Sequence, residues 1–377
     1  MKPQPIRIAQ VIGKANLSGV DTVVMEYYRH IDRKRIQFDF IIDGYEKTPI
    51  DEEIRELGGR IYKVEPYARN VVKSVQQWTA FFRENNYPIV HSHLNTLSVL
   101  PLYAAWRAKV PIRIAHNHST SSPGEGSRTI LKYLLRPGAR LFATHYCSCS
   151  SLAGKWLFGE RFYNSGQVRL IKNAINIDKF SYNFQVRDQV RREFQLEGKL
   201  VVGHVGRFVY QKNHAFLLDI FLETHRRNDS AVLMLVGAGE LEQAIKNKTE
   251  SLGLKKSVLF LGTRTDVASL MQAMDVFIFP SHYEGLGMVA IEAQVAGLPA
   301  IVSEAVPREA NITNLLEYCQ LSQPASVWAE KALVQGGRKD YIRERQDDQL
   351  RRAGYDIETA ARELNEWYEE MLRCLKK

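Results

Sequence analysis

Short apolar runs alternate with longer amphipathic stretches along the first half of the chain. The runs are rich in β-branched residues and bounded by turn residues, as in buried parallel strands, and the stretches between them are long enough for crossover helices. The predicted strands span residues 6–12, 38–42, 60–64, 89–93, 112–116, 142–148 and 168–171. This pattern predicts a doubly wound α/β domain.

The same alternation restarts near residue 199 and predicts a second domain of the same kind. Its predicted strands span residues 199–208, 231–237, 257–262, 275–281 and 298–303. We expect Rossmann-like domains at residues 1–180 and 181–355, and a C-terminal helix that returns to the first domain at residues 356–377. Two such halves imply a cleft between them, and open parallel sheets bind ligands at the carboxyl ends of their strands.

The composition leaves room for two full domains and limits the partners. The chain has 377 residues, of which 45% are hydrophobic, and this suffices for two cores. The formal charge of +9 favours an anionic partner such as a nucleotide, a phosphorylated substrate or an acidic lipid surface. Nucleic acid is a weaker candidate, because no basic run carries interleaved aromatic residues and no zinc-finger spacing is present.

The sequence also bears on the compartment. No apolar run approaches the roughly eighteen residues that span a bilayer, and the apolar part of the N-terminal stretch is too short for a signal peptide. The four cysteines form no Cys-x-x-Cys motif, so we expect free thiols. These features predict a cytoplasmic protein.

Two glycine turns follow predicted strands. Gly19 precedes a helix expected to start near Val20, and glycine lets a backbone approach a phosphate whose charge a helix N-terminus favours. An ordinary strand-to-helix turn explains the same residues. The second turn, "LVGAGELE" at 235–242, is only a partial dinucleotide fingerprint because its third glycine is missing. A nicotinamide cofactor is therefore disfavoured.

Two cations follow the first predicted strand of the second half. Arg207 and Lys212 lie in "GHVGRFVYQKN", with no acidic residue between them. Two cations that project from a strand end into a cleft suit a diphosphate, because they stabilise its negative charge. A solvated basic loop is the alternative explanation.

Two carboxylates flank a glycine-rich turn in "FPSHYEGLGMVAIEAQVAGLPAIVS", residues 279–303. Glu284 lies in the loop after a predicted strand, and Glu292 lies more than one turn into a helix expected to start near Gly287. The backbone amides at this helix start would point into the cleft. Glu292 is placed to accept hydrogen bonds from vicinal hydroxyls such as those of a ribose. Its neighbours are apolar, so burial without a compensating ligand would be costly.

These segments, in this order, resemble the retaining glycosyltransferases of family 4, whose GT-B fold has two Rossmann-like domains facing a cleft. The resemblance is strongest over residues 168–303 and is carried by "GRFVYQKN", "IKNAINIDKF", "VGAGELE" and "FLGTRTDVASLMQAMDVFIFPSHYEGLGMVAIEAQVAGLP". Its most specific element is the pair of glutamates separated by seven residues. The sequence after residue 308 and the segment "RIAHNHS" also resemble the bacterial capsule and exopolysaccharide branch of the family.

The resemblance implies roles in binding a nucleotide sugar. Arg207 and Lys212 would bind the diphosphate. Glu284 would contact hydroxyls of the transferred sugar, and Glu292 would hold the ribose. The backbone amides that would line the site beside Glu284 are those of Gly285, Leu286, Gly287 and Met288.

The resemblance also assigns residues around the base and on the opposite domain. Thr263 and Arg264 would border the base, mainly through backbone groups. Gly19 would close on the diphosphate from the first domain. The family usually carries two glycines at that point, where this chain has Ser18 and Gly19, so the loop departs from the family pattern.

Histidines and cysteines form same-face pairs near the ends of three first-half strands, since residues two apart in a strand share a face. The pairs are His91 with His93, His116 with His118, and Cys147 with Cys149. A zinc site is the less favoured explanation, because structural zinc requires closed tetrahedral ligation and adjacent strand ends rarely converge so tightly. The resemblance instead makes His118, in preference to His116, a contact to the donor sugar or the acceptor. It implies no metal and no other cofactor.

The segment "SRTILKYLLRPGARLF", residues 127–142, predicts an amphipathic helix that ends at Pro137 and Gly138. Its basic residues recur every four positions, and apolar residues occupy the other faces. The basic residues are Arg128, Lys132 and Arg136, and the apolar ones are Ile130, Leu131, Leu134 and Leu135. A basic stripe beside leucines suits an anionic membrane interface. An ordinary surface helix packed on its sheet explains the pattern as well.

The resemblance implies a metal-independent, retaining transfer of a hexose or N-acetylhexosamine from a UDP sugar to a glycan. The acceptor is expected to be linked to polyprenyl diphosphate, as in capsular or exopolysaccharide synthesis, and the enzyme to lie peripherally on the inner face of the membrane. One alternative is a nucleotide-sugar epimerase of GT-B-like fold. Another is a non-catalytic partner that binds a nucleotide sugar and assists a second transferase.

Overall fold

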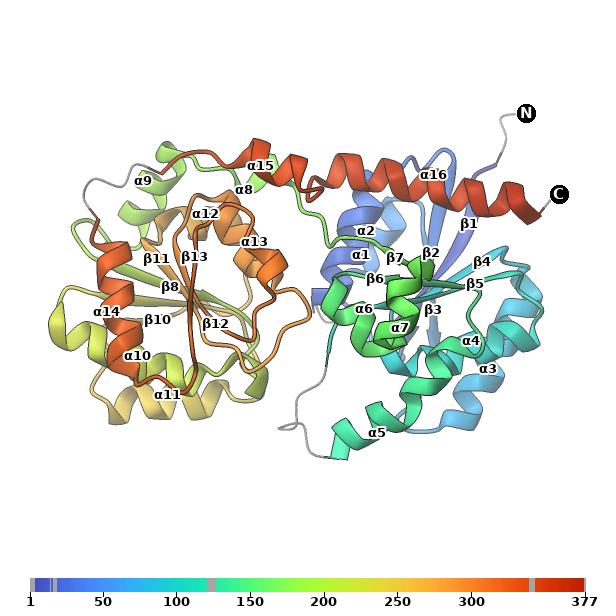
Figure 1. Ribbon diagram of the computed structural model, residues 1–377, viewed down its shortest axis with the longest axis horizontal. Coiled ribbons are helices and arrows are strands. Elements are labelled where there is room, and N and C mark those ends of the chain that lie inside the picture. The colour runs from blue at the N-terminus through green and yellow to red at the C-terminus, as the bar shows by residue number, and fades with distance from the viewer. Residues whose placement is uncertain (1–3, 14, 16–18, 121–126, 339–342, 376–377) are drawn as a thin grey trace. The chain divides into compact units, whose positions relative to one another are not determined.

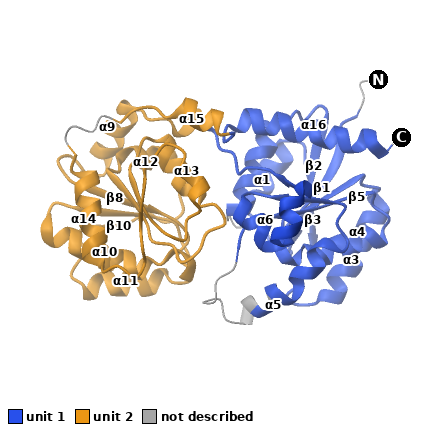
Figure 2. Ribbon diagram, viewed as in Figure 1, with its two compact units in different colours: residues 1–176, 354–377 blue, residues 177–353 orange. Residues whose placement is uncertain are grey.

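The computed structural model describes residues 4–13, 15, 19–120, 127–338 and 343–375. The chain forms two compact units, which Figure 2 distinguishes by colour. Unit 1 comprises residues 1–176 and 354–377, and unit 2 comprises residues 177–353. The boundaries between the units, after residues 176 and 353, therefore lie a few residues before the predicted boundaries at 180 and 355. The last helix of the chain is part of unit 1.

Seven parallel strands form the sheet of unit 1, in the order β3-β2-β1-β4-β5-β6-β7 (Figure 1). The strands are β1 (Ile6–Ile12), β2 (Ile36–Asp43), β3 (Arg60–Val64), β4 (Ile89–Ser92), β5 (Ile112–Asn117), β6 (His145–Ser148) and β7 (Val168–Leu170). β1 is covered on both faces, since Ile8 and Ile12 join one apolar cluster while Ala9 and Val11 join the other. Burial on both faces explains why apolar residues stand at consecutive positions of this strand instead of alternating strictly with polar ones.

The helices of unit 1 supply these two apolar layers. They are α1 (Gly19–His30), α2 (Asp51–Glu56), α3 (Val71–Asn85), α4 (Val99–Arg107), α5 (Ser127–Leu135), α6 (Ser151–Phe158), α7 (Glu160–Phe162) and α16 (Ile357–Leu375), with short turns η1 (Asn95–Ser98), η3 (Arg136–Arg140) and η4 (Tyr163–Gln167). In α16 the buried Ile357, Ala361, Leu364, Tyr368 and Met371 recur at helical spacing. This stripe packs α16 against α1.

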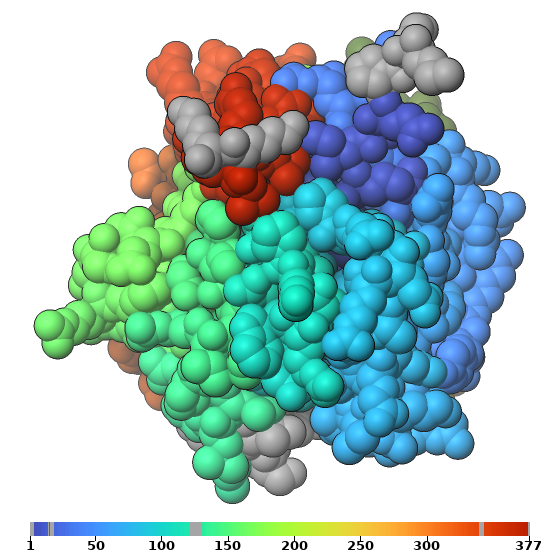
Figure 3. Space-filling view, turned by 90° about the vertical axis from the view of Figure 1, so that its right-hand side faces the viewer, coloured from blue at the N-terminus to red at the C-terminus, as the bar shows by residue number. Residues whose placement is uncertain are grey.

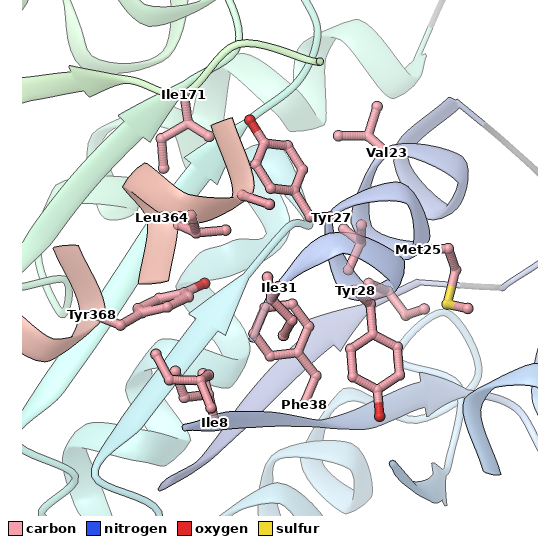
Figure 4. Close-up of a cluster of buried hydrophobic side chains, with 14 of the residues drawn as sticks. Ile8, Val23, Met25, Tyr27, Tyr28, Ile31, Phe38, Ile171, Leu364 and Tyr368 are labelled. Atoms are coloured by element: carbon pink, nitrogen blue, oxygen red, sulfur yellow. The ribbon is translucent and has the colours of Figure 1, made fainter. Parts of the chain in front are cut away.

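The two termini of unit 1 share one core. The space-filling view in Figure 3 shows the red C-terminal helix against dark-blue N-terminal elements. Inside, Tyr368 meets Phe38 of β2 edge to face with ring centres 6.1 Å apart, and Figure 4 shows Leu364 and Tyr368 beside side chains from α1 and β2. Gln10 of β1 extends its side-chain amide to the Tyr368 hydroxyl at 3.3 Å. The core of unit 1 is therefore completed by the last helix of the chain.

Six parallel strands form the sheet of unit 2, in the order β10-β9-β8-β11-β12-β13 (Figure 1). The strands are β8 (Val201–Val205), β9 (Val232–Val236), β10 (Val258–Phe260), β11 (Val276–Phe279), β12 (Ala300–Ser303) and β13 (Leu316–Cys319). β13 was not predicted, because "LEYC" interrupts its apolar residues with polar ones and belongs to the edge of the sheet. Both units have the α/β doubly wound architecture that the sequence predicts.

The helices of unit 2 cover its sheet. They are α8 (Ile177–Phe180), α9 (Phe184–Glu193), α10 (His214–Arg227), α11 (Glu242–Ser251), α12 (Val267–Ala273), α13 (Met288–Val295), α14 (Ala325–Gly336) and α15 (Asp347–Arg352), with short turns η5 (Tyr210–Lys212) and η6 (Arg308–Ala310). Across the described part of both units, none of the helices combines the length and apolar character that crossing a bilayer requires. All four cysteines are free thiols, as predicted.

Candidate functional site

The strand order of unit 2 places a topological switch point between β8 and β11. Chain connections run outward from β8 to β9 and β10 on one side, and from β11 to β12 and β13 on the other. The two strands pair directly, with Val276 opposite Val202. Ligands of open parallel sheets bind at the carboxyl ends of the strands beside such a point. The loops that follow β8 and β11 are therefore the first candidates for a binding site.

The structure brings two of the predicted residues together at this point. Lys212 ends the turn η5 after β8, Glu284 follows β11, and Lys212 Nζ lies 2.7 Å from Glu284 Oε1. Both side chains are largely buried. The Lys212 ammonium also lies 4.6 Å from the centre of the Phe279 ring, which contributes a cation–π contact. A buried cation and a buried carboxylate thus neutralise each other at the switch point.

Further contacts fix the two loops to each other. The His282 amide donates to the Gln211 carbonyl at 2.8 Å, and Gln211 Nε2 donates to the Tyr283 carbonyl at 2.9 Å. The rings of Tyr210 and His282 stack with centres 4.4 Å apart. Gln211 and His282 were not predicted as site residues, although they lie within two residues of Lys212 and Glu284 respectively. These contacts hold the Lys212 and Glu284 backbones in a defined relation.

The glycines of the motif "LVGAGELE" pack closely against the backbone of the loop that follows β8. Gly237 has φ +136°, and a Cβ there would lie 2.1 Å from the Gly206 carbonyl oxygen. At Gly239 a Cβ would lie 2.5 Å from the Phe208 carbonyl oxygen. The Gly206 amide donates to the Val236 carbonyl at 2.9 Å, and this hydrogen bond joins the loop after β8 to the end of β9. The glycines therefore allow the β9 loop to support the loop of Arg207, whose side chain is exposed.

Helix α13 begins where the sequence pattern placed it. Gly287 is its N-cap residue with φ +83°, and the helix runs from Met288 to Val295. Gly285 and Leu286 are buried just before it, and Glu292 is half-buried in its second turn. A helix N-terminus carries unpaired amides and a positive dipole end, which suits an anionic group. Glu284 and the start of α13 thus border one region of unit 2.

Thr263 and Arg264 follow β10 on the surface of unit 2. The Arg264 guanidinium is held by Asp266, with Nε 2.8 Å and Nη2 2.7 Å from its carboxylate oxygens. This bidentate pair engages the side chain locally. The resemblance assigns Arg264 to the base mainly through backbone groups, and this role stays a prediction.

Gly19 is the first residue of α1, after β1 of unit 1. It is exposed, and a Cβ there would meet no atom within 4 Å, so packing of the described residues does not require glycine. The neighbouring Ser18 lies outside the described residues. β1 and β4 form the switch point of the unit 1 sheet, because the strand order reverses between them.

Four histidines converge at that switch point, which corrects the expectation that adjacent strand ends would not bring them together. His91 Nε2 lies 3.1 Å from His116 Nδ1, and His93 Nδ1 lies 2.9 Å from His118 Nε2. β4 and β5 pair in parallel with His91 opposite Ile114, a register that puts His91 and His116 on the same face of the sheet. Burial lowers the pKa of His118 to about 4 and of His91 to about 3, so these rings are neutral at pH 7.

Lowering the pH is expected to destabilise the protein below about pH 6.5. An unfolded histidine takes up a proton near pH 6.5, whereas burial lowers the pKa of His93 and His116 as well as that of His91 and His118. Because the unfolded chain then binds more protons, each of these rings subtracts about 1.4 kcal/mol from the free energy of unfolding between pH 7.5 and 5.5.

The measurement is the urea midpoint at those two pH values. Buried His204 and His214 in unit 2, whose pKa values are lowered to about 4 and about 2, act in the same direction. An equal midpoint at both pH values would contradict this account of the buried rings.

Helix α5 is shorter than predicted. It ends at Leu135, and Arg136 begins the turn η3, so the expected stripe of basic residues does not continue along one helix. The side chains of Arg128 and Leu131 lie outside the described residues. Ile130 and Leu134 are 64% and 72% exposed. Tyr133 of α5 and the turn η3 border a surface hollow of about 600 Å³, which is lined by Tyr133, Arg136, Pro137, Arg140, Leu141, Tyr146, Leu157, Phe158 and Gly159.

Two family models match successive parts of the chain. Residues 17–179 match the model described as Glycosyltransferase Family 4, and residues 186–316 match the model described as Glycosyl transferases group 1. The first match covers most of unit 1 up to β7, and the second covers the loops that carry Lys212 and Glu284.

Individual relatives agree with these matches. EpsF of Bacillus subtilis, named as a glycosyltransferase, is 35% identical over 93% of this chain and 93% of its own length. The Escherichia coli UDP-Gal:alpha-D-GlcNAc-diphosphoundecaprenol alpha-1,3-galactosyltransferase is 28% identical over 79% of each chain. Anabaena HepE, solved in complex with UDP and glucose, superposes with a TM-score of 0.77 at 18% identity, covering 98% of this chain and 100% of its own.

Proposed function

This chain belongs to the family 4 glycosyltransferases, and on that premise we propose that it moves a hexose or N-acetylhexosamine from a UDP sugar to a glycan, with retention. The observation that carries the proposal is the ion pair of Lys212 and Glu284 at the switch point of unit 2. One residue is a cation suited to a diphosphate, and the other is a carboxylate suited to sugar hydroxyls.

The transfer step needs positive charge where the leaving group becomes negative. As the bond between C1 of the sugar and the diphosphate oxygen breaks, the diphosphate gains charge. The acceptor hydroxyl forms the new bond to C1 and passes its proton to the departing diphosphate oxygen. Lys212, Arg207 and the amides at the start of α13 are the groups of unit 2 suited to stabilise that charge. We assign the reaction to these groups, without a catalytic metal.

The carboxylates orient the donor in this proposal. Glu284 exchanges part of its contact with Lys212 for hydroxyls of the transferred sugar, and Glu292 accepts hydrogen bonds from the ribose. Charge-assisted hydrogen bonds of this kind are strong and directional. The roles of Gly19 and His118 stay predictions from the family resemblance.

The choice of UDP and of the acceptor is supported by the Escherichia coli relative, whose name specifies UDP-galactose and a sugar on diphosphoundecaprenol. We extend this to a sugar linked to polyprenyl diphosphate as the acceptor, in capsular or exopolysaccharide synthesis. An epimerase would isomerise the nucleotide sugar without an acceptor, and a non-catalytic partner would form no product. Product formation by the purified chain, with a polyprenyl diphosphate sugar present, separates these alternatives.

Binding of the nucleotide is expected to require Glu292. UDP at about 100 times its Kd should raise the melting temperature of the wild type by roughly 5 to 10 °C. Glu292→Gln removes the charge from the ribose contact and should reduce the shift strongly, since hydrogen bonds to a charged group contribute about 1.5–3 kcal/mol. The measurement is metal-free thermal denaturation with UDP, GDP, ADP and NAD.

Glu250→Gln is the matched control, because Glu250 pairs with Lys255 on the surface of the same unit. Its UDP shift should equal that of the wild type. A response to NAD alone, or an undiminished UDP shift in Glu292→Gln, would remove the proposed role of Glu292.

We also propose that the surface around α5 contacts an anionic membrane. This α5 patch consists of the exposed Ile130, Tyr133, Leu134 and Leu141 together with Lys132, Arg136 and Arg140. Apolar side chains that reach the acyl boundary and cations near anionic headgroups both favour such a contact, each cation by about 1 kcal/mol. A peripheral position on the cytoplasmic face would bring the enzyme to a lipid-linked acceptor.

Sedimentation with liposomes tests this contact. The wild type should sediment with anionic vesicles at low salt and much less with neutral ones, and Leu134→Gln should weaken sedimentation. Val334→Gln is the control, since Val334 is an exposed apolar residue of unit 2. If the wild type stays in the supernatant with anionic vesicles at low salt, the α5 patch is not a membrane contact.

A further inference from the structure

The four histidines of unit 1 form a buried cluster, and the family resemblance gives a role in the transfer to His118 alone. His91 and His93 come from the end of β4, and His116 and His118 from the end of β5. The ring centres of His91 and His93 are 4.2 Å apart, and those of His116 and His118 are 4.0 Å apart. All four side chains are at least nine-tenths buried. Such a concentration of imidazole nitrogens in a core needs an explanation beyond packing.

The second nitrogens of two rings are fixed by neutral oxygen partners. His91 Nδ1 lies 2.7 Å from the Tyr368 hydroxyl, and His93 Nε2 lies 2.8 Å from Gln10 Oε1. These contacts turn His91 Nε2 and His93 Nδ1 towards the imidazoles of β5. Histidines that bind metals are held in the same way, with one nitrogen on the ion and the other on a hydrogen-bond partner.

A small cavity lies among these rings. Its volume is about 20 Å³, which is room for one guest of the size of a water molecule. The cavity is lined by the four histidines, by Gln10 and Tyr368, by Ile171, and by further side chains from α1, β2 and α16. His116 Nε2 is buried and makes no hydrogen bond within the described part of the chain. The cluster therefore has both space and unused ligand capacity.

We propose that His91, His93 and His116 bind a first-row transition metal ion such as Zn²⁺. One nitrogen from each ring lies within 4.8 Å of the other two. Zinc–nitrogen bonds of about 2.0–2.1 Å bring such nitrogens within about 4.2 Å of each other, so small movements of the rings complete the site. An all-imidazole ligand set suits zinc, copper or nickel and does not suit calcium or magnesium.

Binding requires little change in protonation. Burial keeps these rings neutral at pH 7, which is the form that binds metals. Gln10 Oε1 can only accept, so His93 already carries its proton on the outer nitrogen Nε2 and presents an unprotonated Nδ1. The Tyr368 hydroxyl oxygen can accept from His91 Nδ1 in the same way, which leaves His91 Nε2 unprotonated. The ion would join the ends of β4 and β5 and, through Tyr368, helix α16. The site belongs to unit 1 and does not rest on the proposed transfer reaction.

The test is metal binding by the full chain after a chelator wash. The protein is untagged, and its exposed Cys374 is changed to serine so that the surface thiol does not compete as a ligand. Zn²⁺ is titrated calorimetrically, and the bound metal is counted by elemental analysis. We expect one ion per chain, and an absorption spectrum typical of nitrogen ligands when Co²⁺ replaces Zn²⁺.

Variants locate the ion. His93→Gln should abolish the stoichiometric site, and His145→Gln, which changes a histidine of unit 1 outside the cluster, should retain it. Tyr368→Phe keeps the ring in the core and removes only the outer hydroxyl, so it should weaken Zn²⁺ binding by about 10–100-fold. This variant keeps the test informative if His93→Gln does not fold. Absence of Zn²⁺ binding in the wild type, or equal affinity in wild type, His93→Gln and Tyr368→Phe, would show a hydrogen-bonded histidine cluster without a metal.

Discussion

Replacing Lys212 with alanine is expected to lower kcat by about 10²- to 10³-fold under saturating donor and acceptor. The reason is electrostatic, because the ammonium group is the buried cation of the switch point and the leaving diphosphate gains charge in the transition state. The substitution also leaves Glu284 buried without this cation, so some loss of stability is expected as well. Initial rates measured with a UDP sugar at saturation give the effect on the chemical step.

Lys246→Ala is the matched control for that experiment. Lys246 pairs with Glu242 at 2.6 Å and lies 5.6 Å from the Phe260 ring centre, so it has the same kinds of contact on the surface of α11. Its kcat should stay within about twofold of the wild type, as for most exposed ion pairs. Thermal denaturation of both variants separates a folding defect from a catalytic one. An unchanged kcat in a folded Lys212→Ala protein would eliminate the proposed role.

Replacing Gly237 with alanine is expected to lower the free energy of unfolding of unit 2 by about 3 kcal/mol or more. Two effects add, namely the cost of φ +136° for a residue with a side chain and the approach of the new Cβ to the Gly206 carbonyl. Relief of the clash would displace the loop that carries Arg207, so donor affinity should fall together with stability. The measurement is urea unfolding followed by hydrogen exchange in β8 and β9.

Gly253→Ala separates the two effects. Gly253 also has a positive φ, +73°, but a Cβ there would meet nothing within 4 Å. Its substitution should cost only about 1–2 kcal/mol, the backbone contribution alone, and should leave donor affinity unchanged. Equal losses at the two positions would show that the contact between the β8 and β9 loops contributes nothing measurable.

Local patterns predicted the elements of this fold well. The strands at 6–12 and 60–64 have the predicted bounds, and α13 begins directly after Gly287. These features depend on residues that are close in sequence, such as a run of apolar residues or a glycine at a helix start. The edge strand β13 was missed because it is short and only partly apolar.

Contacts between strands were predicted less well, because they depend on sheet order and register. The pairing of Lys212 with Glu284 requires β8 and β11 to be neighbours, although two strands separate them in the sequence. The convergence of His91 with His116 depends on the register of β4 against β5, which no local pattern contains. One signal was available in β1, where the polar Gln10 interrupts the apolar run from Ile8 to Ile12 at a position that contacts His93.

The placement of α16 has a consequence for the order of events during synthesis. The ribosome makes residues 1–176 before unit 2 and residues 354–377 after the whole of unit 2. Domains generally fold as units while the chain emerges, starting from the N-terminus. Here the first-made domain lacks Leu364, Tyr368 and Met371 until translation reaches them, so its core stays uncovered while unit 2 already has all of its strands. The N-terminal half is therefore the later of the two to reach its final packing, and the nascent chain exposes its apolar surface for that interval.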